Sequence, residues 1–259
     1  MNRLITLLTD FGFEDNFVGI IKGVIMQVNP EAITVDISHK VRPHDIFAAA
    51  FLLEGAYKYF PKGSIHAVVV DPGVGTERNI ILVKTRDYFF IAPDNGVLGL
   101  ALKNEPVEKI VEVTNSKYFL RDLSCTFHGR DIIAPVAAFL SKGAGLNRFG
   151  KEIRYMREIA LPPLVREPNR IIGKIIYIDS FGNIITNVKG LDIKGISANL
   201  RVKIKDKIIA GLNKSYASVE KNSPLNLINS FGYLEISVNC ARAKDFFGVE
   251  IGECVELLK

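Results

Sequence analysis

Short apolar runs alternate with longer segments of helical apolar spacing over the first 160 residues. Apolar runs predict strands over 4–9, 33–38 and 65–71, and a β-hairpin over 79–85 and 87–93. Apolar residues at helical spacing predict helices over 16–28, 45–60 and 131–143. This alternation favours an N-terminal α/β domain built on a mostly parallel, doubly wound sheet.

The pattern changes between residues 150 and 170. LPPLVREPNR, residues 161–170, carries three prolines and is typical of a linker. The remaining apolar runs are short and rich in β-branched residues, with Gly, Asn or Ser between them, and no helix of ten residues is evident. We therefore expect an α/β domain over 1–160, a linker over 161–170 and an all-β sandwich or barrel over 171–259.

Composition narrows the class of protein. With 259 residues, 48% of them hydrophobic, the chain can bury a large core. Its formal net charge of +5 is spread among acids, so we expect no nucleic-acid or membrane partner. The three cysteines are widely spaced, which predicts neither disulfides nor a zinc site. The N-terminus is unlike a signal peptide and no apolar run is long enough to cross a membrane, so we expect a cytoplasmic protein.

Polar residues follow several strands of the predicted α/β domain, where open sheets bind their ligands. Asp71 and Arg78 flank the turn in DPGVGTER and can meet across it, although a structural salt bridge explains them equally well. His128 lies between Phe127 and a glycine at a helix start, where the helix dipole favours the neutral imidazole. Asp10, in TDFG, can accept hydrogen bonds from the hydroxyls of a ribose, or simply cap a turn.

The other histidines, His39, His44 and His66, lack such a setting, and we assign them to surface or core packing.

Two turns of the β domain combine the same kinds of residue. Asp179, Phe181 and Asn183 in DSFGN suit an ammonium group and a stacked purine, and are equally ordinary turn residues. NSFG is similar, and Glu235 in the strand after it belongs to one face of that strand, toward solvent or toward a site.

Taken in order, TDFG…EDN, VDPGVGTER, IAPDNG, TFHGRD, IDSFGNIITN and NSFGYLEI resemble the S-adenosyl-L-methionine (SAM) hydroxide adenosyltransferases, relatives of the fluorinases and chlorinases. The resemblance implies a homotrimer whose sites lie where the N-terminal domain of one subunit meets the C-terminal domain of another. It implies hydrolysis of SAM to adenosine and L-methionine, with SAM as substrate and with no cofactor or metal.

The resemblance also implies roles for individual residues. The catalytic triad corresponds to Asp71, Arg78 and His128. The remaining expected substrate-binding residues are Asp10, Asp15, Asn16, Phe127, Asp179, Phe181, Asn183, Ser230, Phe231, Glu235, Val238 and Cys240. Among these, Asp10 corresponds to the ribose ligand, Asp15 and Asp179 to ligands of the methionine amino group, and Ser230 to a ligand of its carboxylate. Phe181, Asn183 and the backbone near Val238 and Cys240 correspond to the adenine site.

Two positions depart from the halogenating relatives. Those enzymes carry an arginine where this chain has Phe231, and an acid where it has Asn16. The methionine carboxylate therefore lacks the expected arginine in this chain.

Three alternatives to SAM hydrolysis stay open at this point. The same scaffold could carry a halogenase, although a carboxylate at Asp71 would repel a halide by roughly 1 to 4 kcal/mol at about 4 Å. Asp10, Asp71, Asp94 and His128 could instead form the metal site of a nucleotidase. A third possibility is a non-catalytic protein that binds SAM or adenosine. Whether Asp71 or His128 acts as the base is also open.

Overall fold

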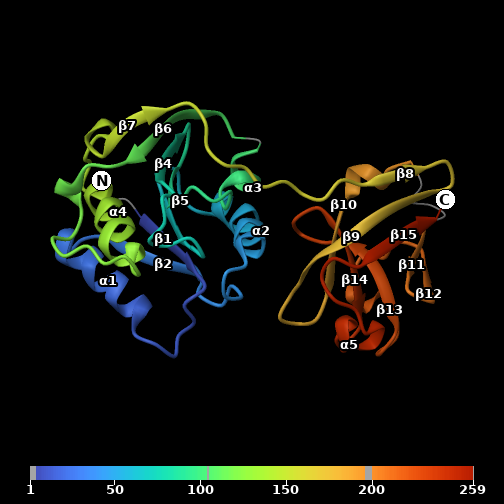
Figure 1. Cartoon of the computed structure of the whole chain (residues 1–259). Coiled ribbons are helices and arrows are strands. Elements are labelled where there is room, and N and C mark those ends of the chain that lie inside the picture. Colours follow the sequence, from blue (N-terminus) through green and yellow to red (C-terminus); the bar gives the residue numbers. More distant parts are fainter. Residues whose placement is uncertain (1–3, 104, 196–199, 259) are drawn as a thin grey trace. The chain divides into compact units, whose positions relative to one another are not determined.

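The computed structural model describes residues 4–103, 105–195 and 200–258 (Figure 1). The chain divides into two compact units, Met1–Ala160 and Leu161–Lys259. Each unit has its own cluster of buried apolar side chains. Among the described residues, no helix is long and apolar enough to cross a membrane.

A seven-stranded sheet forms the centre of the first unit, in the order β2-β1-β3-β5-β4-β6-β7. The strands are β1 (Leu4–Thr9), β2 (Ile33–Ser38), β3 (Ile65–Val69), β4 (Ile80–Thr85), β5 (Phe89–Pro93), β6 (Val107–Val113) and β7 (Gly150–Ile153). β2, β1, β3 and β5 run parallel, whereas β4, β6 and β7 each run antiparallel to the preceding neighbour in the sheet order. The predicted α/β class and hairpin are confirmed, but the sheet is mixed, because the hairpin of β4 and β5 reverses the strand direction.

Helices cover both faces of this sheet. They are α1 (Phe17–Val28), α2 (Ile46–Ala56), α3 (Gly99–Leu102), α4 (Ala134–Ser141) and the short turns η1 (Tyr57–Tyr59), η2 (Ser116–Tyr118), η3 (Gly129–Ile133) and η4 (Leu146–Arg148). α1 and α4 lie on one face and α2 on the other (Figure 1). Ile21 and Ile25, one turn apart on α1, are buried in the same apolar cluster as Leu7 of β1. Burying an aliphatic side chain of this size contributes about 1.5–3 kcal/mol, so this apolar stripe fixes how α1 lies on the sheet.

The last helix of the first unit begins differently from the prediction of 131–143. Residues Gly129–Ile133 form one π-helical turn, in which the Ala134 N–H donates to the Gly129 carbonyl, and α4 continues from there. Pro135 lies inside this continuous helical stretch and has no N–H for the Asp131 carbonyl, which accepts from the Leu120 N–H over 2.9 Å instead. The wide turn leaves His128 directly in front of it.

An antiparallel sheet makes up the second unit, in the order β12-β11-β15-β9-β10-β14-β13, with β8 paired to β9. The strands are β8 (Val165–Glu167), β9 (Arg170–Ile178), β10 (Ile184–Lys189), β11 (Arg201–Ile204), β12 (Lys207–Ala210), β13 (Pro224–Ile228), β14 (Tyr233–Val238) and β15 (Cys254–Leu258). The helical segments are η5 (Gly190–Ile193), η7 (Tyr216–Ser218) and α5 (Ala243–Phe247). The predicted all-β class is confirmed. The range 161–170, predicted as a linker, contains β8.

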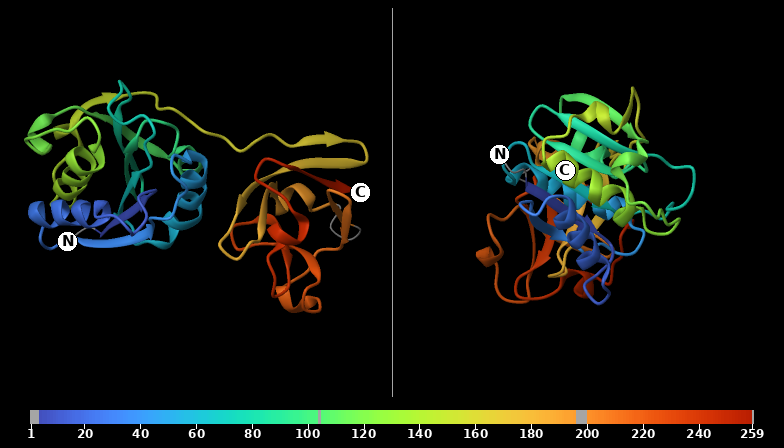
Figure 2. Two further views of the ribbon diagram at one scale, coloured as in Figure 1. Left: turned by 60° about the horizontal axis from the view of Figure 1, so that its bottom comes forward. Right: turned by 90° about the vertical axis from the view of Figure 1, so that its left-hand side faces the viewer.

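The sheet of the second unit curls into a nearly closed barrel, as its yellow-to-red strands show in Figure 2. The buried Asn226 of β13 joins the two ends of the strand order. Its amide nitrogen lies 3.1 Å from the carbonyl oxygen of Ile209 in β12 and 3.1 Å from that of Gly211. β12 is the first strand of the sheet order, so the sheet order gives it no neighbouring strand on its outer side. The two bonds from Asn226 supply hydrogen-bond partners for carbonyls there.

Candidate active site

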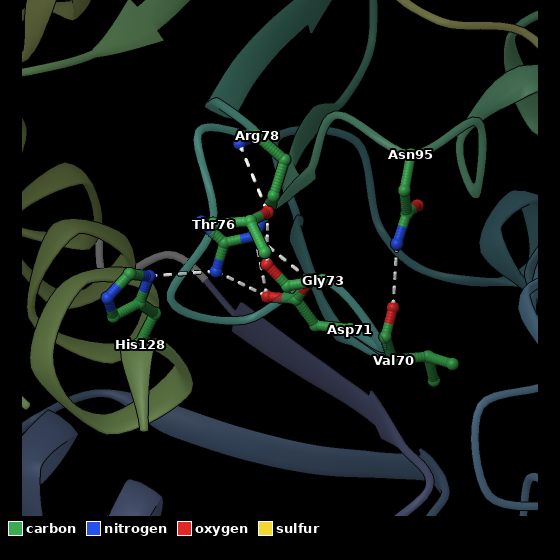
Figure 3. Close-up of polar contacts among 7 residues, drawn as sticks. All are labelled: Val70, Asp71, Gly73, Thr76, Arg78, Asn95 and His128. Carbon is green, nitrogen blue, oxygen red and sulfur yellow. Dashed lines mark hydrogen bonds and ion pairs between the residues drawn. The ribbon is translucent and has the colours of Figure 1, made fainter. Parts of the chain in front are cut away.

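The parallel strands β1, β3 and β5 end at the same edge of the first sheet, and polar residues follow each of them. Asp10 follows β1, Asp71 comes two residues after β3, and Asn95 two residues after β5. The Asn95 side chain donates to the Val70 carbonyl over 2.9 Å (Figure 3). Asn95 therefore fixes the backbone immediately before Asp71. Sequence reasoning gave Asn95 no such role, although its place after a strand of the same edge was a usable signal.

A tight turn returns Arg78 to Asp71. Within it, the Val74 N–H donates to the Asp71 carbonyl over 3.2 Å, and the Thr76 hydroxyl donates to the Gly73 carbonyl over 2.7 Å. Arg78 Nε lies 2.9 Å from both carboxylate oxygens of Asp71, and its Nη2 donates to Oδ2 as well. The side chains are only 7% (Asp71) and 8% (Arg78) exposed, so this ion pair is shielded from solvent far more than a surface salt bridge.

His128 completes the cluster from the opposite side of Arg78. Its Nδ1 lies 2.8 Å from Arg78 Nη2, and Figure 3 shows the guanidinium between the carboxylate and the imidazole. Arginine is a donor only, so Nδ1 must accept, and the proton of the neutral ring is assigned to Nε2. Burial and the Arg78 charge lower the pKa of His128, against the opposing effect of Asp71 and Asp131. The neutral form is therefore the main one at pH 7.

Gly75 lets the Asp71–Arg78 turn pack against the loop that precedes His128. Its φ is +78°, and an added Cβ would lie 2.3 Å from the Cys125 carbonyl oxygen. Only glycine fits this contact, because any side chain would collide with backbone atoms.

Gly75→Ala should therefore lower kcat at least tenfold. The loop that precedes His128 must move away from the added Cβ, and this movement would separate His128 from Arg78. Gly63→Ala is the matched control, because Gly63 also has positive φ (+87°) but has nothing within 4 Å of its added Cβ. Denaturant unfolding should show Gly75→Ala to be about 1–3 kcal/mol less stable than Gly63→Ala. Equal kcat in the two variants would contradict the proposed packing role.

Three phenylalanines connect the segments that carry Asp10 and His128. The ring centroids of Phe11 and Phe127 lie 5.6 Å apart, and each lies 5.3 Å from that of Phe17. Phe127, predicted to bind substrate, is buried. Tilted and edge-to-face contacts of this kind favour one arrangement of the rings, and so limit relative movement of the two segments.

The other predicted residues of the first unit lie in and after the loop that follows β1. Asp10 Oδ2 accepts a hydrogen bond of 2.9 Å from the His44 backbone N–H. Asp15 and Asn16 are exposed just before α1, and the Asn16 side chain makes no capping hydrogen bond there.

In the second unit, Asp179 accepts hydrogen bonds from its own turn. The backbone N–H groups of Phe181 and Asn183 donate to Oδ1 over 2.9 and 2.8 Å, and the Asn183 amide donates to Oδ2 over 2.9 Å. Phe181 is 74% exposed, so its ring presents a face to solvent. Hydrogen bonds within the turn therefore use much of the acceptor capacity of the Asp179 carboxylate. The exposed Phe181 ring gives the same turn an aromatic surface.

The remaining predicted residues lie on or near β14. Ser230 and Phe231 are exposed in the turn before β14. Val238 is buried, and Cys240 has a φ of +60°.

Glu235 is 4% exposed and accepts hydrogen bonds from the Tyr216 hydroxyl over 2.8 Å and from Ser237 over 2.7 Å. Burial, together with the Glu235 carboxylate, raises the pKa of Tyr216 well above its usual value. Sequence reasoning missed Tyr216, because nothing in its local sequence links it to a strand almost twenty residues later.

The four residues of the metal alternative do not gather around a common point. Across residues 4–103, 105–195 and 200–258, no group of three or more His, Cys, Asp or Glu side chains is arranged to hold a metal ion. Asp71 faces Arg78, and Asp94 accepts from the Arg157 backbone N–H over 2.7 Å. This donor arrangement gives the nucleotidase alternative no geometric support.

The fold and the site define a two-domain protein in which an α/β unit carries a buried Asp–Arg–His cluster at its strand ends and an antiparallel β unit follows. Sequence profiles of the SAM hydroxide adenosyltransferase N-terminal and C-terminal domains match residues 5–150 and 173–256. The chain belongs to this family, which confirms the resemblance seen in its motifs.

Relatives and a solved structure match over nearly the full chain. An "(R)-S-adenosyl-L-methionine hydrolase" from Salinispora tropica is 35% identical, covering 96% of this chain and 95% of its own. A protein of the same name from Methanocaldococcus jannaschii is 34% identical, with 98% and 95% covered. A "Fluorinase" from Actinoplanes is 25% identical, with 100% and 98% covered. The crystal structure of an uncharacterized conserved protein from Thermotoga maritima superposes with a TM-score of 0.92 at 37% identity, with 98% and 100% covered.

Proposed function

We propose that this chain hydrolyses SAM to adenosine and L-methionine. Family membership and the hydrolase names of relatives at 34–35% identity support this reaction over halogenation. The observation that carries the proposal is the cluster in which Arg78 contacts both Asp71 and His128. The enzyme acts without a cofactor, and its nucleophile is water.

In this proposal the cluster holds one water molecule for attack on the ribose C5′. The Nε2–H of His128 donates to the water oxygen, since Nδ1 is occupied by Arg78. Asp71 retains acceptor capacity beyond its bonds to Arg78, so a water hydrogen can point to it. Asp71 is then the base, and His128 fixes the orientation of the oxygen lone pair. We thus propose Asp71, and not His128, as the base, a choice that the sequence leaves open.

The bond changes balance without a metal or redox partner. The water oxygen forms a bond to C5′, the C5′–S bond breaks, and its electron pair goes to sulfur, giving neutral methionine sulfur. The proton from water passes through Asp71 to solvent. In-line positioning and exclusion of bulk water do most of the catalytic work, because the sulfonium is already a good leaving group.

The same arrangement favours water over a halide as nucleophile. Water offers a hydrogen to a carboxylate and a lone pair to an N–H, which complements Asp71 and His128 together. A halide ion offers no hydrogen to Asp71 and would be repelled by it. Arg78 is held by Asp71 and is not a free cation for a halide.

We assign the substrate contacts as follows. Asp10 accepts hydrogen bonds from the ribose hydroxyls, and the exposed Phe181 ring stacks on adenine, with Asn183 and the backbone near Val238 and Cys240 beside it. Asp15 and Asp179 bind the methionine amino group, and Ser230 its carboxylate. Phe231 replaces the arginine of the halogenating relatives, so this carboxylate is held without a cation at that position.

The assembly we propose is a homotrimer in which residues from two subunits complete each site. Its support is the family resemblance, and static light scattering of the purified chain should give a mass near three times 28.7 kDa. A monomer that hydrolyses SAM at full rate would contradict it.

The proposed reaction is tested by incubating the protein with SAM in water enriched in ¹⁸O and identifying products by mass spectrometry. We expect methionine without label and adenosine with one ¹⁸O atom at the 5′ position. Parallel incubations with a chelator and with chloride separate the rivals. Loss of activity with the chelator would support a metal enzyme, 5′-chloro-5′-deoxyadenosine would indicate a halogenase, and SAM bound but intact after hours would indicate a binding protein.

A further inference from the structure

Strand β1 carries two buried threonine–histidine pairs. Thr6 Oγ1 lies 2.8 Å from His66 Nδ1, and Thr9 Oγ1 lies 2.8 Å from His39 Nδ1. All four residues are 0% exposed. The two pairs have the same chemistry and the same geometry, so their surroundings decide what each pair does.

The Thr6–His66 pair, in the middle of β1, lies in an apolar environment. The His66 ring packs among aromatic rings that include Tyr57 and Phe90, and its Nε2 makes no hydrogen bond to any described residue. Burial lowers the pKa of His66 to about 3, so its ring is neutral at pH 7. This pair is a core contact, one of the two settings, surface or core packing, that the sequence predicts for His66.

The Thr9–His39 pair, at the end of β1, has further polar contacts on both sides. His39 Nε2 lies 3.1 Å from Asp36 Oδ1, an ion-pair distance whose angles do not meet hydrogen-bond geometry, and Lys22 Nζ lies 2.6 Å from Asp36 Oδ2. At the other end, Thr9 Oγ1 accepts from the Phe11 backbone N–H over 3.3 Å. The prediction that His39 serves only in packing is therefore incomplete, since it joins a carboxylate to the loop after β1.

One assignment of protons satisfies this chain of contacts. Although burial opposes it, the nearby Lys22 and His39 lower the pKa of Asp36, so its carboxylate is charged at pH 7. The His39 proton is then placed on Nε2, facing Asp36, and the Thr9 hydroxyl donates to Nδ1. The Thr9 oxygen remains an acceptor for the Phe11 amide. With this assignment the Asp36 carboxylate faces the Nε2–H of His39, and both contacts of the Thr9 hydroxyl join a donor to an acceptor.

Asp10 lies within the segment that this chain holds. The Gly12 N–H donates to the His39 carbonyl over 2.7 Å, and the His44 N–H donates to Asp10 Oδ2 over 2.9 Å. His44 adopts a φ of +67°, a conformation that a non-glycine residue keeps only where its surroundings require it. The loop after β1 is thus tied to residues 39–44 on both sides of Asp10. The His44 amide binds Oδ2 of Asp10, and Oδ1 is not part of this contact.

We propose that Asp36, His39 and Thr9 form a positioning chain that orients Asp10 for the ribose hydroxyls of the substrate. The inference rests on the ribose role given to Asp10 in the proposed function. None of the three residues touches substrate. They act by holding the backbone of residues 9–12 in one conformation.

The test compares adenosine with 2′,3′-dideoxyadenosine, which lacks both ribose hydroxyls, by isothermal titration calorimetry of the full-length protein. Wild type should bind adenosine more tightly than the dideoxy ligand. Thr9→Val should reduce this preference about tenfold, leave the affinity for 2′,3′-dideoxyadenosine within about twofold, and resemble Asp10→Asn in both respects. Thr9→Ser, which keeps the hydroxyl, should restore the preference.

Thr6→Val is the matched control, because it removes the same hydroxyl from the same strand and the same kind of histidine contact. It should cost as much stability as Thr9→Val and leave the ligand preference unchanged. If Thr9→Val does not fold, Asp36→Asn replaces it, since Asp36 is partly exposed, and should reduce the preference about threefold.

Two results would overturn the inference. One is a Thr9→Val or Asp36→Asn protein that keeps the wild-type preference for adenosine. The other is a wild-type protein without any preference, which would also remove the ribose role of Asp10. Failure of the proposed reaction is seen separately, as intact SAM in the wild-type incubation, and a selective loss of adenosine affinity in Thr9→Val would still support the positioning chain.

Discussion

Replacing Asp71 by Asn should lower kcat for SAM hydrolysis by about 10²–10⁴ and change KM by only a few fold. The amide keeps the shape of the side chain but cannot take a proton from water, and general base catalysis contributes a factor of this size. Asp71 is assigned to the attacking water and not to the substrate, so binding is largely retained. Steady-state kinetics at pH 7 measure both parameters.

A loss of stability in Asp71→Asn must be distinguished from this loss of catalytic activity. Arg78 is 8% exposed, and breaking a buried ion pair by removing one partner costs about 3–5 kcal/mol. Denaturant unfolding of Asp71→Asn therefore accompanies the kinetics, and Asp71→Asn with Arg78→Met removes both charges and should recover stability without activity. A fully folded Asp71→Asn enzyme with wild-type kcat would rule out Asp71 as the base.

His128→Ala should lower kcat about 10²-fold or more, because the water loses the Nε2–H donor. His128→Asn separates the two ring functions, since its amide oxygen can still accept from Arg78 while the Nε2–H is missing. It should be nearly as slow as His128→Ala. Wild-type turnover in both variants would remove His128 from the mechanism.

The pH dependence gives a second measurement of His128. In the wild type, kcat/KM should fall on the acid side with a pKa below the usual histidine value of about 6.5, because burial and then Arg78 lower it. Protonation places a hydrogen on Nδ1 opposite the Arg78 guanidinium and breaks their contact. The folded state binds this proton less readily than the unfolded chain, so stability also falls as the pH drops below 6.5. This acid limb should disappear from the profile of His128→Asn.

The approach of Asp71, Arg78 and His128 to one another could be predicted because it depends on order along the chain. Parallel strands end at one edge, and a short glycine-rich turn returns the chain on itself. Strand β6 was missed because three of the seven residues in VEKIVEV are charged and the apolar ones do not alternate strictly with them. β7, at the edge of the sheet, has only four residues, and its lysine and glutamate are exposed. Both strands therefore carry little apolar signal.

Other features depend on hydrogen bonds that apolar periodicity does not encode. The apolar residues of Gly129–Ile133 fit an α-helix as well as a π turn, so the sequence pattern does not predict the π turn. The contact between His39 and Asp36 was within reach, because they are three residues apart, but Thr9 comes from a different strand. The bonds from Tyr216 to Glu235 and from Asn226 to Ile209 likewise join residues that only the folded barrel brings together.

The π turn before α4 also limits how this protein can change in length. A π turn takes up one more residue than an α-helical turn, so deleting one residue between His128 and Pro135 would relax it to an ordinary α-helix and leave the imidazole on nearly the same side of the axis. Adding one residue there would instead rotate the imidazole by about 100° and point it away from Arg78, while α4 itself would keep its packing. Spacing from His128 to α4 is therefore as much a determinant of activity as the residues themselves, and a sequence can keep all three polar residues yet lose the site through a single insertion.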